Sequence, residues 1–204
     1  DQYLINPYGL LFHEITASSL LKVDFDGNVL SGDYPYNDAG HSIHTAVLKV
    51  RPEVNSVLHS HTRAGTAVSC MECGLLPLSQ QGNEIMPLVC YHDYDIATSN
   101  EEECERLGND IGQDKWAMLM RNHGALTAGR TVAEAFYFMY FLEVACKIQV
   151  DVLASGQKYV VPKASALKKL GDYGRVKPEV ASTAVRSWDA LIRDLDNTQP
   201  DYKT

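Results

Sequence analysis

Three histidines have the types and spacing of a metal site. His59 and His61 lie two residues apart at the end of a segment, residues 54–61, that alternates between apolar and polar side chains. Side chains two apart on a strand point to the same face, so both imidazoles can reach one point. His123 follows the apolar run of residues 116–120. If these two strands lie near each other, three imidazoles converge, as in a catalytic zinc site that keeps its fourth position open.

The spacing of these histidines leaves two interpretations open. The first is a site for Zn²⁺, with another divalent metal possible, and the second is a pair of hydrogen-bonded structural histidines, since His-x-His pairs without metal are common. Cys70 and Cys73 form a C-x-x-C pair with no matching second pair. We interpret them as buried helical thiols rather than as a redox or zinc site.

Alternating and helical periodicities predict the elements that position the histidines. Short strands interleaved with helices, together with a hairpin turn at residues 24–28, predict an α/β sandwich whose sheet is not purely parallel. Strands are expected at residues 21–25, 28–31, 54–61, 85–90, 116–120 and 125–128, and helices at 44–50, 62–73, 101–111 after an Asn100 N-cap, 131–154 and 181–195.

Composition and charge limit the classes of partner that the protein can bind. The chain has 204 residues and a formal net charge of −8, which argues against nucleic acid or an anionic membrane, because phosphate groups need clustered lysine and arginine. No apolar run approaches the roughly 20 residues that cross a bilayer. Residues 1–10 do not resemble a signal peptide, and the five cysteines are irregularly spaced, so we expect reduced thiols and a cytoplasmic location.

The chain divides into a domain and a tail. Residues 1–156 are expected to form one domain, and residues 157–204 a C-terminal arm and helix. Residues 155–178 carry six basic side chains, which predicts an exposed arm that wraps a neighbouring subunit. The six are Lys158, Lys163, Lys168, Lys169, Arg175 and Lys177.

The histidine segments resemble a known family. Residues 58–62 (LHSHT) and 121–125 (RNHGA) resemble the metal motifs of the class II aldolase/adducin family. The similarity extends over residues 4–156 and is closest to the adducin-like branch. It implies a three-layer α/β/α sandwich with a central mixed, largely antiparallel sheet. It also implies zinc at the three histidines, and a homo-oligomer, a tetramer by this resemblance, with sites near subunit interfaces.

Two departures from the family concern its sugar-phosphate aldolases. Those enzymes carry a catalytic glutamate about nineteen residues before the first metal histidine, and here that position is Gly40. Two serines that hold the substrate phosphate in the aldolases correspond to Asp38 and Ala39. A carboxylate repels phosphate. Both departures argue against a sugar-phosphate aldolase or epimerase.

Five residues are candidates for the missing acid–base role: His41, His44, Glu84, Tyr91 and His92. We favour His41, because it adjoins the vacant position, together with Tyr91 and with Glu84, which is expected in a polar loop.

The sequence therefore predicts a zinc-dependent lyase of the aldolase or decarboxylase type, acting on a small non-phosphorylated carbonyl or carboxylate substrate. In the resembled enzymes zinc stabilises an oxyanion as it develops. The alternative is a non-catalytic adducin-like interaction module. A weaker possibility is an epimerase or an oxygen-dependent decarboxylase on the same scaffold.

Overall fold

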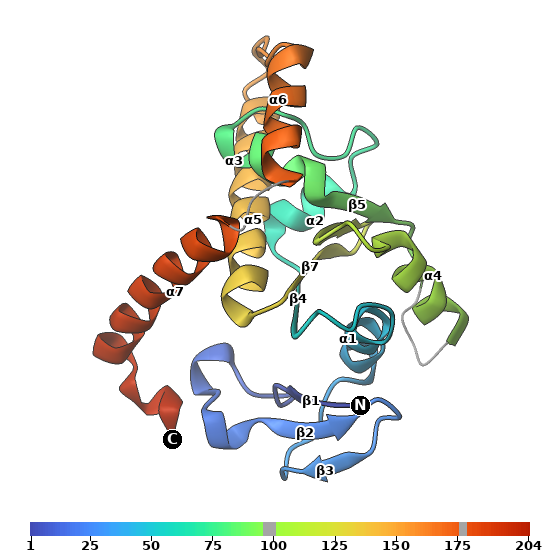
Figure 1. Cartoon of the computed structure of the whole chain (residues 1–204), viewed down its shortest axis with the longest axis vertical. Coiled ribbons are helices and arrows are strands. Elements are labelled where there is room, and N and C mark those ends of the chain that lie inside the picture. Colours follow the sequence, from blue (N-terminus) through green and yellow to red (C-terminus); the bar gives the residue numbers. More distant parts are fainter. Residues whose placement is uncertain (96–100, 176–178) are drawn as a thin grey trace.

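The computed structural model describes residues 1–95, 101–175 and 179–204, with side chains described outside residues 171–182. Its central sheet has the order β4-β7-β6-β5 (Figure 1). The strands are β4 (Ser56–Ser60), β5 (Val89–His92), β6 (Ala117–Met120) and β7 (Gly124–Gly129). β7 pairs antiparallel with both β4 and β6, while β5 pairs parallel with β6. The mixed, largely antiparallel sheet is therefore confirmed.

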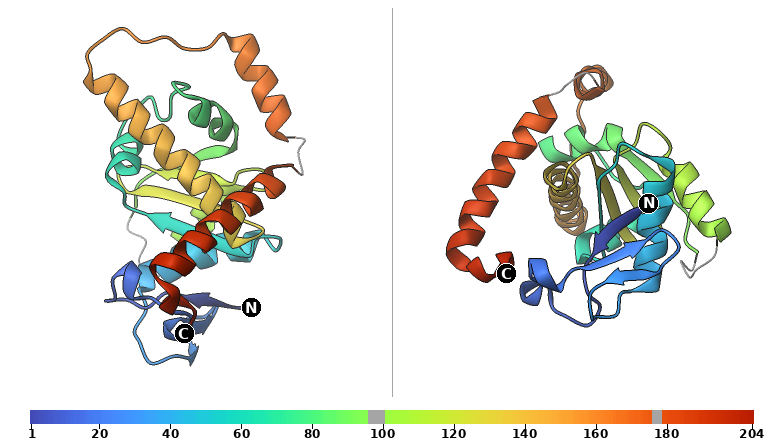
Figure 2. Two further views of the ribbon diagram at one scale, coloured as in Figure 1. Left: turned by 90° about the vertical axis from the view of Figure 1, so that its left-hand side faces the viewer. Right: turned by 60° about the horizontal axis from the view of Figure 1, so that its bottom comes forward.

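Helices cover both faces of this sheet (Figure 2). Ala117 and Leu119 of β6 pack with the cluster of α2 and α5, whereas Met118 and Met120 pack with the cluster of α1 and α4. Alternate side chains of one strand thus enter two cores, which is why residues 116–120 are continuously apolar. The three-layer sandwich is confirmed. The helices are α1 (Asp38–Val50), α2 (Arg63–Ser69), α3 (Gln80–Ile85), α4 (Glu101–Ile111) and α5 (Val132–Ala154).

A second, three-stranded antiparallel sheet lies below α1 in Figure 1. It consists of β1 (Gln2–Ile5), β2 (Leu21–Asp24) and β3 (Val29–Ser31). The predicted hairpin turn is present, because Asp24 Oδ1 accepts hydrogen bonds from the amides of Asp26 and Asn28. Two short 3-10 helices, η1 (Phe12–Glu14) and η2 (Ala17–Ser19), join β1 to β2.

The C-terminal part contains two further helices and a short 3-10 turn. They are α6 (Ala164–Arg175), α7 (Glu179–Thr198) and η4 (Pro200–Lys203). α7 lies against α5, where the rings of Trp188 and Phe136 are 5.7 Å apart. The expected arm of residues 155–178 therefore includes helix α6, and its described lysines, residues 158, 163, 168 and 169, are exposed. The division at residue 156 stays a prediction.

Several expected elements differ from the structure. The strand predicted at residues 85–90 is present with other bounds: α3 occupies residues 80–85 and the 3-10 helix η3 (Met86–Leu88) follows, so the strand begins only at Val89. Ser79 starts α3 by accepting a hydrogen bond from the Gly82 amide. Glu84 accordingly lies on a helix and not in a polar loop.

Other differences concern helix ends. α1 begins six residues before the predicted start, because the Asn37 side chain accepts hydrogen bonds from the first free amides of the helix. α2 ends at Ser69, so Cys70 and Cys73 are exposed rather than buried helical thiols. The predicted Asn100 cap lies outside the described residues. Among the described helices, none is long and apolar enough to cross a bilayer.

Candidate metal centre

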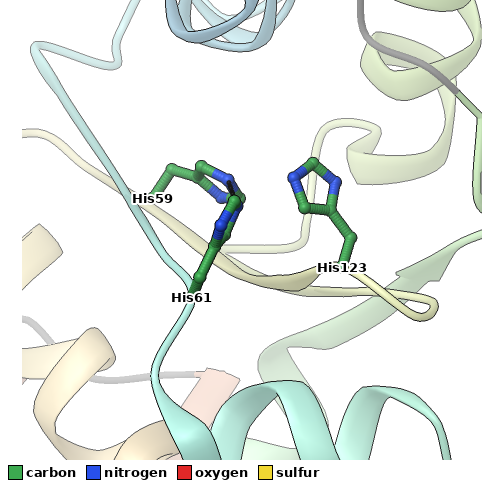
Figure 3. A group of neighbouring side chains, drawn as sticks. All are labelled: His59, His61 and His123. Atoms are coloured by element: carbon green, nitrogen blue, oxygen red, sulfur yellow. Dashed lines mark hydrogen bonds between the residues drawn. The ribbon is translucent and has the colours of Figure 1, made fainter.

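Three imidazole rings point toward one another at one edge of the central sheet (Figure 3). His59 belongs to β4, His61 follows its last residue, and His123 lies in the loop between β6 and β7. The ring centroids are 4.7 Å apart for His59 and His61, 4.8 Å for His59 and His123, and 4.6 Å for His61 and His123. One ligand nitrogen from each ring lies within 4.8 Å of the others.

Strand β7 brings the two histidine segments together. It pairs Ser60 of β4 with Ala125, and its first residue, Gly124, pairs with Met120 of β6. The end of β4 and the β6–β7 loop therefore meet on opposite sides of the start of β7. The two strands need not be neighbours themselves, since β7 lies between them.

The loop carrying His123 is a tight turn with two backbone requirements. Asn122 adopts a left-handed conformation with a φ of 55°, which asparagine tolerates better than most residues. The His123 amide donates to the Met120 carbonyl at 3.1 Å. A Cβ added at Gly124 would lie 3.1 Å from Cδ2 of His61 and would collide with the Ser60 carbonyl oxygen. Glycine at this position therefore lets the two segments approach.

The hydrogen bonds of His59 leave one nitrogen free for a metal. Its Nδ1 lies 3.0 Å from the Ala125 carbonyl oxygen, which can only accept, so Nδ1 carries the proton and donates. Its Nε2 keeps a lone pair and lies 2.8 Å from Nε2 of His61. Histidine ligands of zinc commonly donate their second nitrogen to a backbone carbonyl in this way.

The electrostatics favour neutral imidazoles. Burial, followed by the nearby His123 and His61, lowers the pKa of His59 to about 3. Burial, His61 and His92 also lower the pKa of His123. Only a neutral imidazole binds a metal. At neutral pH these rings therefore offer lone pairs without first losing a proton.

The donor set fits zinc or another borderline divalent ion. Zn–N bonds of about 2.0–2.1 Å place two ligands of a tetrahedral ion roughly 3.4 Å apart. The two Nε2 atoms of His59 and His61, now 2.8 Å apart, would need to separate by roughly half an ångström. His61 is exposed, so one side of the cluster is open to a substrate.

The start of α2 is fixed next to His61. Thr62 caps the helix by accepting a hydrogen bond from the Gly65 amide, and its hydroxyl donates to Oε2 of Glu143 on α5. Lys147 pairs with the other Glu143 oxygen at 3.4 Å. The residue that follows the second histidine is thus tied to the longest helix.

The three favoured acid–base candidates lie on different elements. His41 is on α1, where its Nδ1 lies 2.8 Å from the Tyr3 hydroxyl. Tyr91 is on β5, and its hydroxyl accepts a hydrogen bond from the Leu75 amide at 3.0 Å. Glu84 is on α3 and accepts a hydrogen bond from the Gln80 side chain at 2.6 Å. In the described residues none of the three contacts the histidine cluster, and their catalytic roles stay predictions.

His92 has a supporting position that the sequence did not reveal. It is buried, with Nδ1 2.7 Å from Asp110 and Nε2 2.6 Å from Glu103. Its carbonyl oxygen accepts a hydrogen bond from the Arg121 amide at 2.8 Å, at the start of the loop that carries His123. His92 therefore helps to hold this loop.

Tyr94, which had no assigned role, lies beside the cluster with its ring centroid 6.2 Å from that of His123. Nothing in the spacing of the sequence indicated this contact.

Comparison with known proteins agrees with this geometry. Residues 1–150 match the Class II Aldolase and Adducin N-terminal domain. A Pseudomonas aeruginosa protein, described provisionally as an aldolase class 2 protein, is 41% identical over 206 residues, covering 100% of this chain and 79% of that protein. Mouse alpha-adducin is 38% identical over 211 residues, covering 97% of this chain but 28% of that protein.

Solved structures share the fold over the whole chain. An aldolase II superfamily protein from Pseudomonas syringae has a TM-score of 0.91 and 41% identity, covering 100% of this chain and 81% of that chain. An L-fuculose 1-phosphate aldolase from Glaciozyma antarctica has a TM-score of 0.82 and 25% identity, covering 100% and 78%. The chain belongs to the class II aldolase and adducin family.

Proposed function

We propose that this protein is a metal-dependent lyase, with zinc at His59, His61 and His123, that acts on a small non-phosphorylated carbonyl or carboxylate compound. The observation that carries the proposal is the convergence of three imidazoles around one point with an open side. A closed structural site would have a fourth protein ligand. Within the described residues, no fourth histidine, cysteine or carboxylate joins the cluster.

The metal ligands and the residues that orient them have separate roles in this proposal. The bound ion would act as a Lewis acid toward a substrate carbonyl or carboxylate and stabilise negative charge on its oxygen. His59 is oriented by the Ala125 carbonyl, and His123 by the turn at Asn122. Because these contacts already orient both rings, little reorganisation is needed when the metal and the substrate bind.

The start of α1 supports a substrate without phosphate. Helix N-termini bind phosphate through free backbone amides. Here the Asn37 side chain already accepts hydrogen bonds from the amides of Ala39 and Gly40, at 3.0 and 3.3 Å. Asp38 adds a negative charge in the first turn. The likeness to an L-fuculose 1-phosphate aldolase therefore supports carbon–carbon lyase chemistry but not its phosphorylated substrate.

A second candidate function is a non-catalytic interaction module. Gly40 provides no acid–base side chain at the family's glutamate position, and alpha-adducin is 38% identical. The intact histidine cluster favours the enzyme, since an interaction module has no evident need for three converging imidazoles.

We also propose that the protein is a cytoplasmic homo-oligomer, a tetramer by family resemblance. The exposed lysines of the arm, residues 158–169, support contact with another subunit. Light scattering on the purified protein measures the mass: a monomer at micromolar concentration contradicts this part of the proposal.

An assay panel tests the lyase function. Zinc-loaded protein is incubated with non-phosphorylated hydroxy-keto acids, hydroxyketones and aldehydes, and carbon–carbon cleavage or decarboxylation is followed by NMR. We expect turnover of at least one compound that is lost in His59→Ala and His123→Ala. The exposed His13 gives the matched control His13→Ala, which should retain full activity. Zinc-loaded protein without any histidine-dependent turnover would favour the interaction module.

A further inference from the structure

One face of α1 carries both Gly40 and His44. The two residues are four apart, so they lie one turn apart on the same side of the helix. Helical side chains lean toward the N-terminus, so the imidazole of His44 is directed along this face toward the turn that contains Gly40. A Cβ built at Gly40 would meet only Asn37, at 3.7 Å. The space over this face is therefore open where the related aldolases carry a glutamate.

Helix α1 lies close to the histidine cluster. Ile43 and Val47 of α1 pack in one core with Val57 of β4, the strand that carries His59. In Figure 3, α1 passes above the three rings, on the side opposite α2. His44 lowers the pKa of His59 by its charge, so the two rings lie within electrostatic reach of each other.

The ring of His44 has no fixed partner. Within the described parts of the chain, no hydrogen bond or ion pair involves it, although the residue is half-buried. The other acid–base candidates differ in this respect. His41 is bonded to Tyr3, and His92 is held between two carboxylates. Burial, followed by the charge of His41, lowers the pKa of His44 to about 4, so its imidazole is neutral at pH 7.

We propose that His44 is the catalytic acid–base residue of this site and takes the place of the carboxylate that is missing at Gly40. The proposal rests on the lyase function proposed above, and the substrate class is a small carbonyl compound with an acidic C–H bond. In the step, the C–H bond next to the carbonyl breaks and its proton moves to a ring nitrogen of His44. The electron pair forms a C=C bond, and the carbonyl π pair moves onto oxygen. The reverse step returns the proton to carbon.

Hydrogen–deuterium exchange tests this step directly. Zinc-loaded protein is incubated in D₂O with hydroxyacetone or pyruvate, and NMR follows deuterium entering the carbon next to the carbonyl. We expect wild-type protein to catalyse the exchange and His44→Ala to be at least roughly 100-fold slower, the usual contribution of a general base. His44→Ala and His44→Gln should both keep about one zinc per chain, as a residue outside the ligand set requires. His13→Ala is the control.

A second variant tests the shared position. Adding Gly40→Glu to His44→Ala restores a carboxylate on the same helix face, where the added Cβ finds only an ordinary contact. We expect the exchange to recover at least about tenfold. No recovery would contradict the idea that the two positions serve one substrate.

The remaining outcomes separate this proposal from the proposed function. Exchange at the wild-type rate in His44→Ala and His44→Gln overturns the role of His44 and leaves the lyase function standing. Loss of zinc in both variants shows that His44 acts on the metal site and overturns its acid–base role. Zinc-loaded wild-type protein that exchanges neither probe contradicts both proposals.

Discussion

The half-buried, neutral His44 makes the stability of the protein sensitive to acid. Its pKa is about 4 in the folded chain, because of burial and then His41, and about 6.5 in the unfolded chain. The unfolded state therefore binds this proton more tightly. The stabilising contribution is fully present above pH 6.5 and is lost as the pH falls toward 4. At about 1.4 kcal/mol per pKa unit, the free energy of unfolding should fall by roughly 2–3 kcal/mol between pH 7 and pH 4.5 from this group alone.

The variant His44→Gln isolates this contribution. Glutamine does not titrate, so the variant lacks the acid loss that comes from position 44. The pKa of His59 is lowered in both proteins mainly by burial, and the charge of His44 is the smallest of its causes, so most of the His59 contribution cancels in the comparison. The assay is urea unfolding at pH 7 and pH 4.5 with EDTA, which removes metal from the balance. We expect wild-type protein to lose roughly 2–3 kcal/mol more than the variant over this interval. His13→Gln, at an exposed position, should behave as the wild type. Equal losses in wild type and His44→Gln would refute the reasoning.

Three further substitutions test the supports of the metal centre. Gly124→Ala places a Cβ 3.1 Å from the His61 ring. It should cost about 1–3 kcal/mol in urea unfolding and lower the zinc content, and an unchanged zinc content would contradict the role of this close approach. Asn122→Val, at a φ of 55°, should cost roughly 1–2 kcal/mol, whereas Asn122→Gly should cost far less; equal losses would exclude backbone strain. Thr62→Val removes both the helix cap and the hydrogen bond to Glu143. Thermal unfolding should show that the free energy of unfolding falls by about 1–2 kcal/mol, and an unchanged value would contradict the role of the cap.

Local patterns identified the three histidines that form the cluster. The period of two in β4 placed His59 and His61 on one side, and the apolar run before His123 marked a buried strand. Their convergence depends on β7, which lies between β4 and β6. Strand order and register arise from long-range pairing, so the residues alone could only state this convergence as a condition.

Other features depend on single side chains, which the periodicity of apolar residues does not reveal. Asn37 starts α1 early, and Ser79 turns a polar stretch into helix α3. The candidate His41 was favoured because it follows Gly40 in the sequence, but on a helix the next residue points about 100° away. His41 accordingly contacts Tyr3. His44, one turn after Gly40, lies on the same side of the helix as Gly40. This relation becomes clear only when both residues are known to belong to α1.

Zinc content tests the central claim most directly. The protein is purified after expression with added zinc, dialysed, and its metal measured by mass spectrometry. We expect about one zinc per chain for wild type and for His13→Ala, and less than about a tenth for His59→Ala, His61→Ala and His123→Ala. Wild-type protein with less than about a tenth of an equivalent, or the same zinc content in the three histidine variants as in wild type, would contradict a metal centre at this site.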